Sequence, residues 1–244
     1  MFDRATGVYH FKTQHFLYTF IYPALAFVAA IWLIELKGLD LRFSRLFYDS
    51  TQHTWPFGHA WLTETLLHDW SKRLLTLVGI VFFLLMITSW LVPRYRKHAK
   101  LYTFLFFSSI IGPSIVGALK GATHMYCPRN LTMFGGSKPY IHLFDKVAAG
   151  LPIGHCFPGG HSSGGFAFVN LYYFFLVTAP RFRFHGLAFG LLLGIVFSLA
   201  QEARGAHFPS HDLFSLAICW FSATVLFHVF YTRRFDVNKP TGLT

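Results

Sequence analysis

Charged side chains are absent from six long stretches of the chain. The stretches without Lys, Arg, Asp or Glu are residues 13–34, 74–93, 101–119, 147–180, 184–201 and 213–232. A charged side chain at the centre of a bilayer costs about 2.5–3.5 kcal/mol, and a helix needs about 20 apolar residues to cross the hydrocarbon core. The pattern therefore predicts an all-α, polytopic membrane protein with six transmembrane helices in a bundle.

The fourth stretch is too long for one helix. Its first part is rich in Gly and Pro, so we expect the helix itself to begin near Ser162. A further helical pattern precedes the second stretch, in residues 58–75, where Leu62, Leu66 and Trp70 recur at a spacing of four. This spacing puts the three side chains on one face and predicts an interfacial helix in the first outer loop. Such a helix could equally be a partly buried helix that covers the bundle or a gate for the substrate.

The composition agrees with a single integral membrane domain over residues 1–244. Hydrophobic residues make up 54% of the chain and charged residues only 13%, whereas soluble domains carry about a quarter charged residues. The net charge of +11 would suggest nucleic acid as the partner of a soluble protein. Here the basic residues lie in short turns between apolar stretches, so they indicate orientation in a membrane and no nucleic-acid partner. The first apolar stretch has no cleavage site after it and is expected to remain as a helix.

Dense basic clusters mark one side of the membrane. They occupy residues 94–100, 181–183 and 233–239 and flank the same ends of the second, fourth and sixth predicted helices. The positive-inside rule makes this side cytoplasmic, with both termini inside. The outer loops are then residues 35–73, 120–161 and 202–212. We expect a protein of the bacterial inner (cytoplasmic) membrane with its site on the periplasmic side; the sequence does not indicate an oligomeric state.

Three polar clusters stand at helix ends, and all three fall in the outer loops. They are KGATHMYCPR (120–129), PGGHSSGG (158–165) and ARGAHFPSHD (203–212). A single lysine at a helix end usually reaches to the interface, and a single histidine in a loop is usually solvated. Three such clusters on one face are much less expected by chance, so we expect them to form one site.

The clusters carry groups that suit a phosphate. Lys120, Arg129 and Arg204 supply positive charge. Gly160, after a second glycine and at the start of a predicted helix, offers backbone N–H groups to an anion. These groups indicate a site for a phosphate that is bound by cations and main-chain donors.

Two histidines and one carboxylate supply the chemistry. His161 and His207 can act as nucleophile or as acid and base near neutral pH. Asp212 is placed to hold one imidazole in the required tautomer, as a carboxylate does in hydrolase triads. Together with the cations, they predict transfer of a phosphoryl group through a histidine.

A metal site is the competing use of these imidazoles. The outer loops carry His124, His142, His155, His161, His207 and His211. However, Pro209 separates the last two, no H-x-x-x-H pair stands on an evident helix beside a Glu, and there is no CxxC motif. The pattern therefore favours phosphate chemistry without a metal.

The three clusters resemble the three motifs of the type 2 phosphatidic acid phosphatase superfamily, which also includes the vanadium haloperoxidases. The family patterns are Lys-x6-Arg-Pro, Pro-Ser-Gly-His and Ser-Arg-x5-His-x3-Asp, and the resemblance covers residues 120–212 and the six-helix plan. It implies a phosphatase that needs neither metal nor cofactor. Carried over, His207 attacks phosphorus, and His161 protonates the leaving group and then acts as general base for water.

The first two motifs depart from the family pattern at named positions. Lys120 and Pro128 keep their spacing, but Cys127 stands where the family has Arg, and Arg129 follows the proline. Gly159 replaces the Ser of the second motif, which removes one hydroxyl donor.

The third motif departs further. Gln201 occupies the Arg position, and Arg204 lies three residues before His207; His211 occupies the Asp position, and Asp212 comes one residue later. One step on a regular helix turns a side chain by about 100°, so Asp212 points in a different direction from the family Asp. The motif reads either as a compensated variant of the same site or as a weakened enzyme, and we favour the first.

Two of the three cysteines also lie beside the motifs. Cys127 and Cys156 are both in outer loops, where an oxidising compartment allows a disulfide. Two small buried thiols fit the sequence equally well. Cys219 lies within the last predicted span.

The sequence thus predicts a metal-independent membrane lipid phosphatase. Its partners are membrane lipids, and its substrate is a lipid phosphomonoester or diphosphate, for which phosphatidate, phosphatidylglycerophosphate, undecaprenyl diphosphate and lipid A phosphates all fit. The residues expected to carry the activity are His207, His161 and Asp212 for catalysis and Lys120, Arg129, Arg204 and Gly160 for phosphate binding. The alternatives are a lipid phosphotransferase that uses the same phosphohistidine and a non-catalytic lipid-phosphate binding or transport protein on the same scaffold.

Overall fold

The structure is a computed structural model, and it describes residues 2–3, 8–9, 13–143, 145–148 and 150–231. Within these residues the regular elements are helices and a pair of two-residue antiparallel strands, β1 (Phe2–Asp3) and β2 (Val8–Tyr9), joined by turns and loops. The basic cluster at 233–239 and the last residue of the sixth predicted span lie outside the described residues.

The apolar stretches of the sequence form long helices. In the labels used here, η marks a segment with 3₁₀ or π hydrogen bonding. In chain order the helical elements are α1 (Thr13–Phe16), η1 (Leu17–Ile21), α2 (Tyr22–Lys37), α3 (Leu39–Arg45), η2 (Leu62–Trp70), α4 (Ser71–Leu91), η3 (Pro93–His98), α5 (Ala99–Lys120), η4 (Pro128–Asn130), η5 (Thr132–Phe134), α6 (Gly160–Phe166), η6 (Ala167–Asn170), α7 (Leu171–Thr178), η7 (Pro180–Phe182), α8 (Arg183–Ala203) and α9 (Pro209–Tyr231).

Five helical segments of the described chain are long and apolar enough to cross a membrane. They are Gln14–Lys37, Leu62–Leu91, Pro93–Lys120, Pro180–Ala203 and Pro209–Tyr231. They correspond to the first, second, third, fifth and sixth predicted spans. The fourth takes a different form, because α6, η6 and α7 follow one another without a gap over residues 160–178 and a 3₁₀ stretch divides them. This helix begins two residues before the expected Ser162.

Glycines on α8 allow it to pack closely against this divided segment. Gly186, Gly190 and Gly194 recur at every fourth position and are buried. A Cβ at Gly190 would overlap the backbone of Val169, and a Cβ at Gly194 would overlap the ring of Phe166. Small residues at this spacing are what allow membrane helices to approach closely.

The expected interfacial helix is not a separate element. Residues Leu62–Trp70 form η2, which continues directly into α4, and the joined helix has 30 residues. The charges at Asp69, Lys72 and Arg73 suggested a boundary, but charged residues do not end a helix, and neither Gly nor Pro interrupts this stretch. At 1.5 Å per residue the helix is about 45 Å long, whereas the hydrocarbon core is about 30 Å thick.

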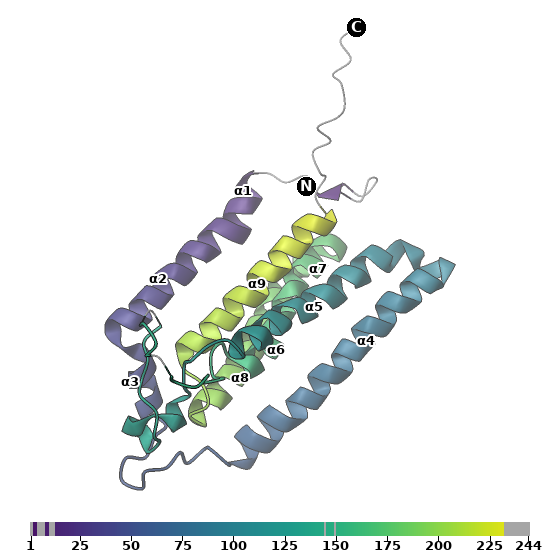
Figure 1. Cartoon of the computed structure of the whole chain (residues 1–244). Helices are drawn as coiled ribbons and strands as arrows, with labels where there is room; N and C mark the ends of the chain where they lie inside the picture. The colour runs from purple at the N-terminus through teal and green to yellow at the C-terminus, as the bar shows by residue number, and fades with distance from the viewer. Residues whose placement is uncertain (1, 4–7, 10–12, 144, 149, 232–244) are drawn as a thin grey trace.

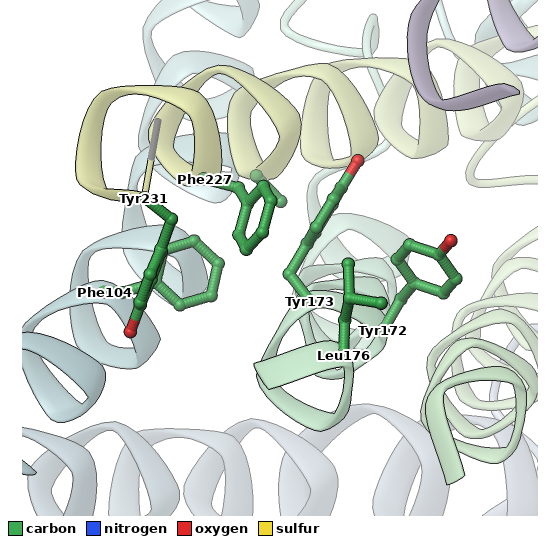
Figure 2. Packing of buried hydrophobic residues seen from close by; sticks show 7 residues of the cluster. Phe104, Tyr172, Tyr173, Leu176, Phe227 and Tyr231 are labelled. Atoms are coloured by element: carbon green, nitrogen blue, oxygen red, sulfur yellow. The ribbon is translucent and has the colours of Figure 1, made fainter. Parts of the chain in front are cut away.

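An aromatic cluster joins α5, α7 and α9. Its buried members are Phe104, Tyr172, Tyr173, Leu176, Ala223, Phe227 and Tyr231, most of which are labelled in Figure 2. The rings of Tyr173 and Phe227 stack with their centroids 4.7 Å apart, and the Tyr173 hydroxyl lies 2.6 Å from the Thr224 hydroxyl. The polar tip of this ring therefore finds a partner inside the core.

The two ends of the bundle differ. Figure 1 shows α3, the start of α4 and the long connection after α5 at the end where α9 begins. The start of α1, the turn between α4 and α5 and the last turn of α9 lie at the other end. All three polar clusters of the sequence therefore share one end, which we call the loop end.

Candidate active site

Main-chain contacts bring the three polar clusters together at the loop end. The Arg129 N–H donates to the Gly205 carbonyl at 2.9 Å, which joins the first cluster to the third. The Gly159 N–H donates to the His211 carbonyl at 3.0 Å, which joins the second to the third. A disulfide between Cys127 and Cys156 joins the first to the stretch just before the second. The disulfide that the sequence left open is therefore present in the structure.

A tight turn between α8 and α9 presents His207. Gly205 adopts a left-handed conformation with φ of 64°, which favours glycine because it has no Cβ. A Cβ there would also come within 2.5 Å of the Trp55 ring. The Ala206 N–H donates to the Gln201 carbonyl at 2.9 Å and closes the end of α8. His207 is thus fixed two residues after the turn.

His207 is buried, with 5% of its surface exposed. Its Nδ1 lies 3.8 Å from the Sγ of Cys156, and its ring centroid lies 5.9 Å from that of His211. Burial lowers the pKa of His207 well below its ordinary value, and the charge of Lys120 lowers the pKa further. The ring is therefore neutral at pH 7, which is the form that can act as a nucleophile.

His161 is held by η2 and α4. Its Nε2 lies 2.6 Å from the Leu67 carbonyl oxygen and 3.1 Å from the Ser71 hydroxyl. A carbonyl oxygen can only accept, so the proton of the neutral ring is on Nε2 and the lone pair is on Nδ1. The ring also packs against His68 and Phe197, each at a centroid distance of 4.8 Å. Among the described residues, no hydrogen bond joins His161 directly to His207.

Lys120 lies between the two histidine-bearing segments. Its ammonium nitrogen is 3.3 Å from the point where a Cβ of Gly160 would stand, so it reaches the first residue of α6. Its charge also acts on His207 and on Asp212. Lys120, Gly160, His207 and Asp212 are therefore the predicted site residues that the structure brings together.

Asp212 faces α6 and not His207. Its Oδ1 accepts from the Ser162 hydroxyl at 2.5 Å, and its carboxylate charge interacts with that of Glu202. Within the described part of the chain, Oδ2 is buried without a hydrogen-bond partner. The carboxylate thus binds the start of α6 and interacts with the charge of Lys120. This agrees with its position one residue after the Asp of the family motif.

The two arginines lie beside this group. Arg204 donates from Nε to the Gly58 carbonyl at 3.1 Å and from its terminal nitrogen to Glu64 at 3.2 Å. The Arg129 side chain is exposed, and its charge acts on Arg204. Arg204 is therefore engaged by the first outer loop and η2, and its guanidinium is buried.

The family's Arg and Asp positions hold buried side chains without partners. His211 is fully buried, and both of its ring nitrogens lack a hydrogen bond within the described residues. The Nε2 of Gln201 is likewise buried and unpaired in the described chain. Buried polar groups are normally satisfied, so His211 and Gln201 are exceptions among the described residues.

One group of side chains has the spacing of a metal site. Cys156, His207 and His211 each offer a ligand atom, and these atoms lie within 4.8 Å of one another. The Cys156 sulfur is bonded to Cys127, however, and a disulfide sulfur is not the thiolate that metals bind. The three residues become a plausible metal site only when the disulfide is reduced.

Several contacts that hold the site leave little or no signal in the sequence. The Leu67 carbonyl and the Gly58 carbonyl act through the main chain, which leaves no signal in the sequence. Glu64 lies 140 residues from the arginine it binds. Ser162 stands next to His161 in the second cluster, and its hydroxyl was the one available signal for a partner of Asp212.

The profile of the PAP2 superfamily matches residues 101–235 of the chain. The chain belongs to the PAP2 superfamily. The match runs from α5 through α9 and contains all three polar clusters, whereas η2, α4 and the first outer loop precede it. No curated protein and no solved structure matches the chain.

Membership of the PAP2 superfamily supports a phosphatase or phosphoryl-transfer activity on lipid-like substrates. The apolar helices and the PAP2 family together fit an integral membrane protein. The elements outside the match hold His161 and Arg204, so part of the site's support comes from sequence that the PAP2 profile does not cover.

Proposed function

We propose that the protein is a metal-independent membrane lipid phosphatase that works through a phosphohistidine on His207. The position of Lys120 carries this proposal. Its ammonium reaches Gly160 at the start of α6 and acts on the neutral ring of His207. A phosphate at this point would meet a cation, the N-terminal amides of a helix and a nucleophile.

The tautomers indicate which nitrogen performs each step. Nδ1 of His207 faces Cys156, so Nε2 attacks phosphorus and forms an N–P bond while the ester P–O bond breaks. His161 first takes up a proton from solvent on Nδ1, beside the one it holds on Nε2. It gives this Nδ1 proton to the leaving oxygen, and the lipid alcohol departs. His161 then takes a proton from water, whose oxygen attacks phosphorus. The N–P bond breaks and releases inorganic phosphate.

An apolar cavity gives the lipid chain a place beside this site. It has a volume of about 250 Å³, lies between α4, α5 and the α6–η6 segment, and includes Gly79, Phe82 and Phe168 in its lining. Lys72 lines both this cavity and a second one of about 540 Å³. An apolar cavity with a cation at one end suits an acyl or prenyl chain that carries a phosphate.

The proposal includes six crossings, with residues 160–178 as the fourth. At 1.5 Å per residue these 19 residues span about 28 Å, close to the hydrocarbon thickness. Basic η3 and η7 lie opposite the loop end, so the positive-inside rule turns the loop end outward. In a bacterial inner membrane, this orientation faces the site toward the periplasm.

A lipid panel assayed for phosphate release tests the function. The purified protein in mixed micelles with EDTA would receive phosphatidate, phosphatidylglycerophosphate, undecaprenyl diphosphate or a lipid A phosphate, with vanadate as inhibitor. We expect release from at least one lipid. His207→Ala and His161→Ala should each abolish it, while His185→Ala, at the exposed start of α8, should not. Normal release by either active-site variant would refute the assignment.

The same assay separates the alternatives. A base-stable, acid-labile phosphoryl label that is lost in His207→Ala would support the phosphohistidine. Label that moves to an added lipid hydroxyl would indicate a phosphotransferase. Vanadate-sensitive lipid binding without any release or label would indicate a non-catalytic binding protein.

A further inference from the structure

The Nδ1 side of His207 faces the disulfide. Cys156 is fully buried, and its sulfur lies 3.8 Å from Nδ1 of His207 and 3.1 Å from the Ala206 carbonyl oxygen. The same sulfur is bonded to Cys127. The bridge therefore sits directly against the turn that presents His207.

The main chain of Cys156 also bonds the ring of His207, so Cys156 contacts this ring through both its backbone and its sulfur. The other side chains that could orient the ring are engaged elsewhere or make no hydrogen bond to it. Asp212 accepts from Ser162, and His211, at the family's Asp position, makes no hydrogen bond within the described residues. A disulfide sulfur has lone pairs and no hydrogen. Facing it, Nδ1 carries the proton and Nε2 keeps the lone pair.

We propose that the Cys127–Cys156 disulfide is a positioning element for His207. Cys156 contacts Nδ1 of the ring, where the carboxylate of a hydrolase triad would bind. The inference rests on the proposed role of His207 as nucleophile. It makes catalysis depend on the oxidised state of the bridge.

The loop stays attached when the bridge is open. The Thr123 hydroxyl donates to the Phe157 carbonyl at 2.6 Å, and the Gly154 N–H donates to the Thr123 carbonyl at 2.9 Å. The Tyr126 hydroxyl donates to the Pro152 carbonyl at 2.8 Å. Because these contacts join the same two segments, reduction should loosen the ring of His207 without unfolding the protein.

Reduction of the folded wild type is the first test. Dithiothreitol passes two electrons and two protons to the Cys127–Cys156 bond, which yields two thiols and cyclic oxidised dithiothreitol. Misplacing a reacting group by about 1 Å costs roughly 100-fold, so we expect kcat to fall at least about tenfold, with KM nearly unchanged. Reoxidation should restore it. Full activity with both thiols free would overturn the proposal.

Substitutions separate the sulfur contact from the cross-link. Cys127→Ser breaks the bond but leaves a sulfur beside His207, whereas Cys156→Ala removes that sulfur, so Cys156→Ala should lose more kcat. Cys219→Ser, a buried free thiol on α9, should remain as sensitive to dithiothreitol as the wild type. Assays contain EDTA, because a free Cys156 thiolate with His207 and His211 could bind a metal.

The pH profile distinguishes positioning from a general loss of structure. The groups that act on His207 are Lys120 on α5, His161 on α6, His211 on α9 and the Cys156 main chain. A loosened ring gains water, which relieves the burial that lowers its pKa. The acid limb of kcat/KM should therefore move to higher pH in Cys156→Ala. A lower rate with an unmoved limb, or a wild-type rate, would overturn the inference.

The two proposals fail differently. Release by His207→Ala would overturn the nucleophile assignment and with it the proposed mechanism. An inactive His207→Ala beside a fully active, reduced wild type would leave the proposed function standing and remove only the role of the disulfide. If Cys156→Ala fails to fold, the reduction experiment on the folded wild type decides.

Discussion

Replacing Asp40 should weaken the attachment of the first outer loop to α9. Asp40 on α3 is buried, with 4% of its surface exposed. Its Oδ1 accepts from the Ser210 N–H at 3.0 Å, and its Oδ2 accepts from the Ser210 hydroxyl at 2.5 Å. Ser210 is the second residue of α9, where the helix has no internal partner for its N–H. Asp40 therefore caps this helix from 170 residues away.

The size of the effect follows from these two bonds. Asp40→Ala leaves two buried donors of Ser210 unpaired, at about 1–3 kcal/mol each. Allowing for entry of water, we expect a loss of about 2–4 kcal/mol in the free energy of unfolding, measured by chemical unfolding in mixed micelles. Asp49→Asn is the control, because that carboxylate caps an exposed turn at Thr51.

Asp40→Asn isolates the charge. Burial raises the pKa of Asp40 from 3.8 to about 6. The native state therefore keeps a proton that the unfolded chain has already lost between these values, and stability falls as the pH rises from about 4 to above 6. At 1.36 kcal/mol per pKa unit, the fall is about 3 kcal/mol.

An asparagine has no such charge, so the stability of Asp40→Asn relative to wild type should improve by about 3 kcal/mol from pH 4 to pH 7. Two results would refute the reasoning. One is an Asp40→Ala variant within about 0.5 kcal/mol of wild type, the range of ordinary surface substitutions. The other is a difference between wild type and Asp40→Asn that stays constant over this pH range.

Three further predictions concern the substrate and the packing. Glu64→Gln should release Arg204 and lower the Ki for vanadate several-fold, at a stability cost of under about 1 kcal/mol; an unchanged Ki would make the Arg204–Glu64 pair purely structural. Gly79→Leu should fill the cavity and raise KM for a long-chain lipid but not for p-nitrophenyl phosphate, whereas Gly117→Leu, a glycine with equally open surroundings, should change neither. Gly190→Leu should prevent α8 from packing on η6 and lower the yield of folded protein in a detergent-extraction assay; a wild-type yield would contradict the close approach.

The helices and the meeting of the three clusters could be predicted because they depend on local composition. Gaps in charge locate membrane helices, since the bilayer excludes charges over a fixed length. The fourth span was predicted as one helix, but a 3₁₀ stretch divides it. Its packing depends on Gly190 and Gly194, which lie on another helix. The direct continuation of η2 into α4 was not predicted. Charged residues indicate where a helix leaves the hydrocarbon core, but they do not indicate where the helix ends.

The meeting of the candidate site residues could be predicted from the sequence, whereas their contacts could not, and their roles stay predictions. His207, Lys120 and Gly160 could be grouped from the sequence because each stands at a helix end on the same side. Arg204 was expected on a phosphate, and its partner Glu64 lies 140 residues earlier. Pairings over such distances depend on tertiary packing, which periodicity does not report.

Residues 35–73, which precede the matched PAP2 region, contact both histidine-bearing segments. η2 supplies the Leu67 carbonyl to His161 and Glu64 to Arg204. α3 supplies Asp40 to the start of α9. Each of the two histidine-bearing segments therefore touches sequence outside the matched region. A movement of η2, which also begins the helix that lines the apolar cavity, would change the orientation of His161 and the shape of the cavity together. In the proposed mechanism, one helix would then link binding of the lipid chain to the orientation of the acid.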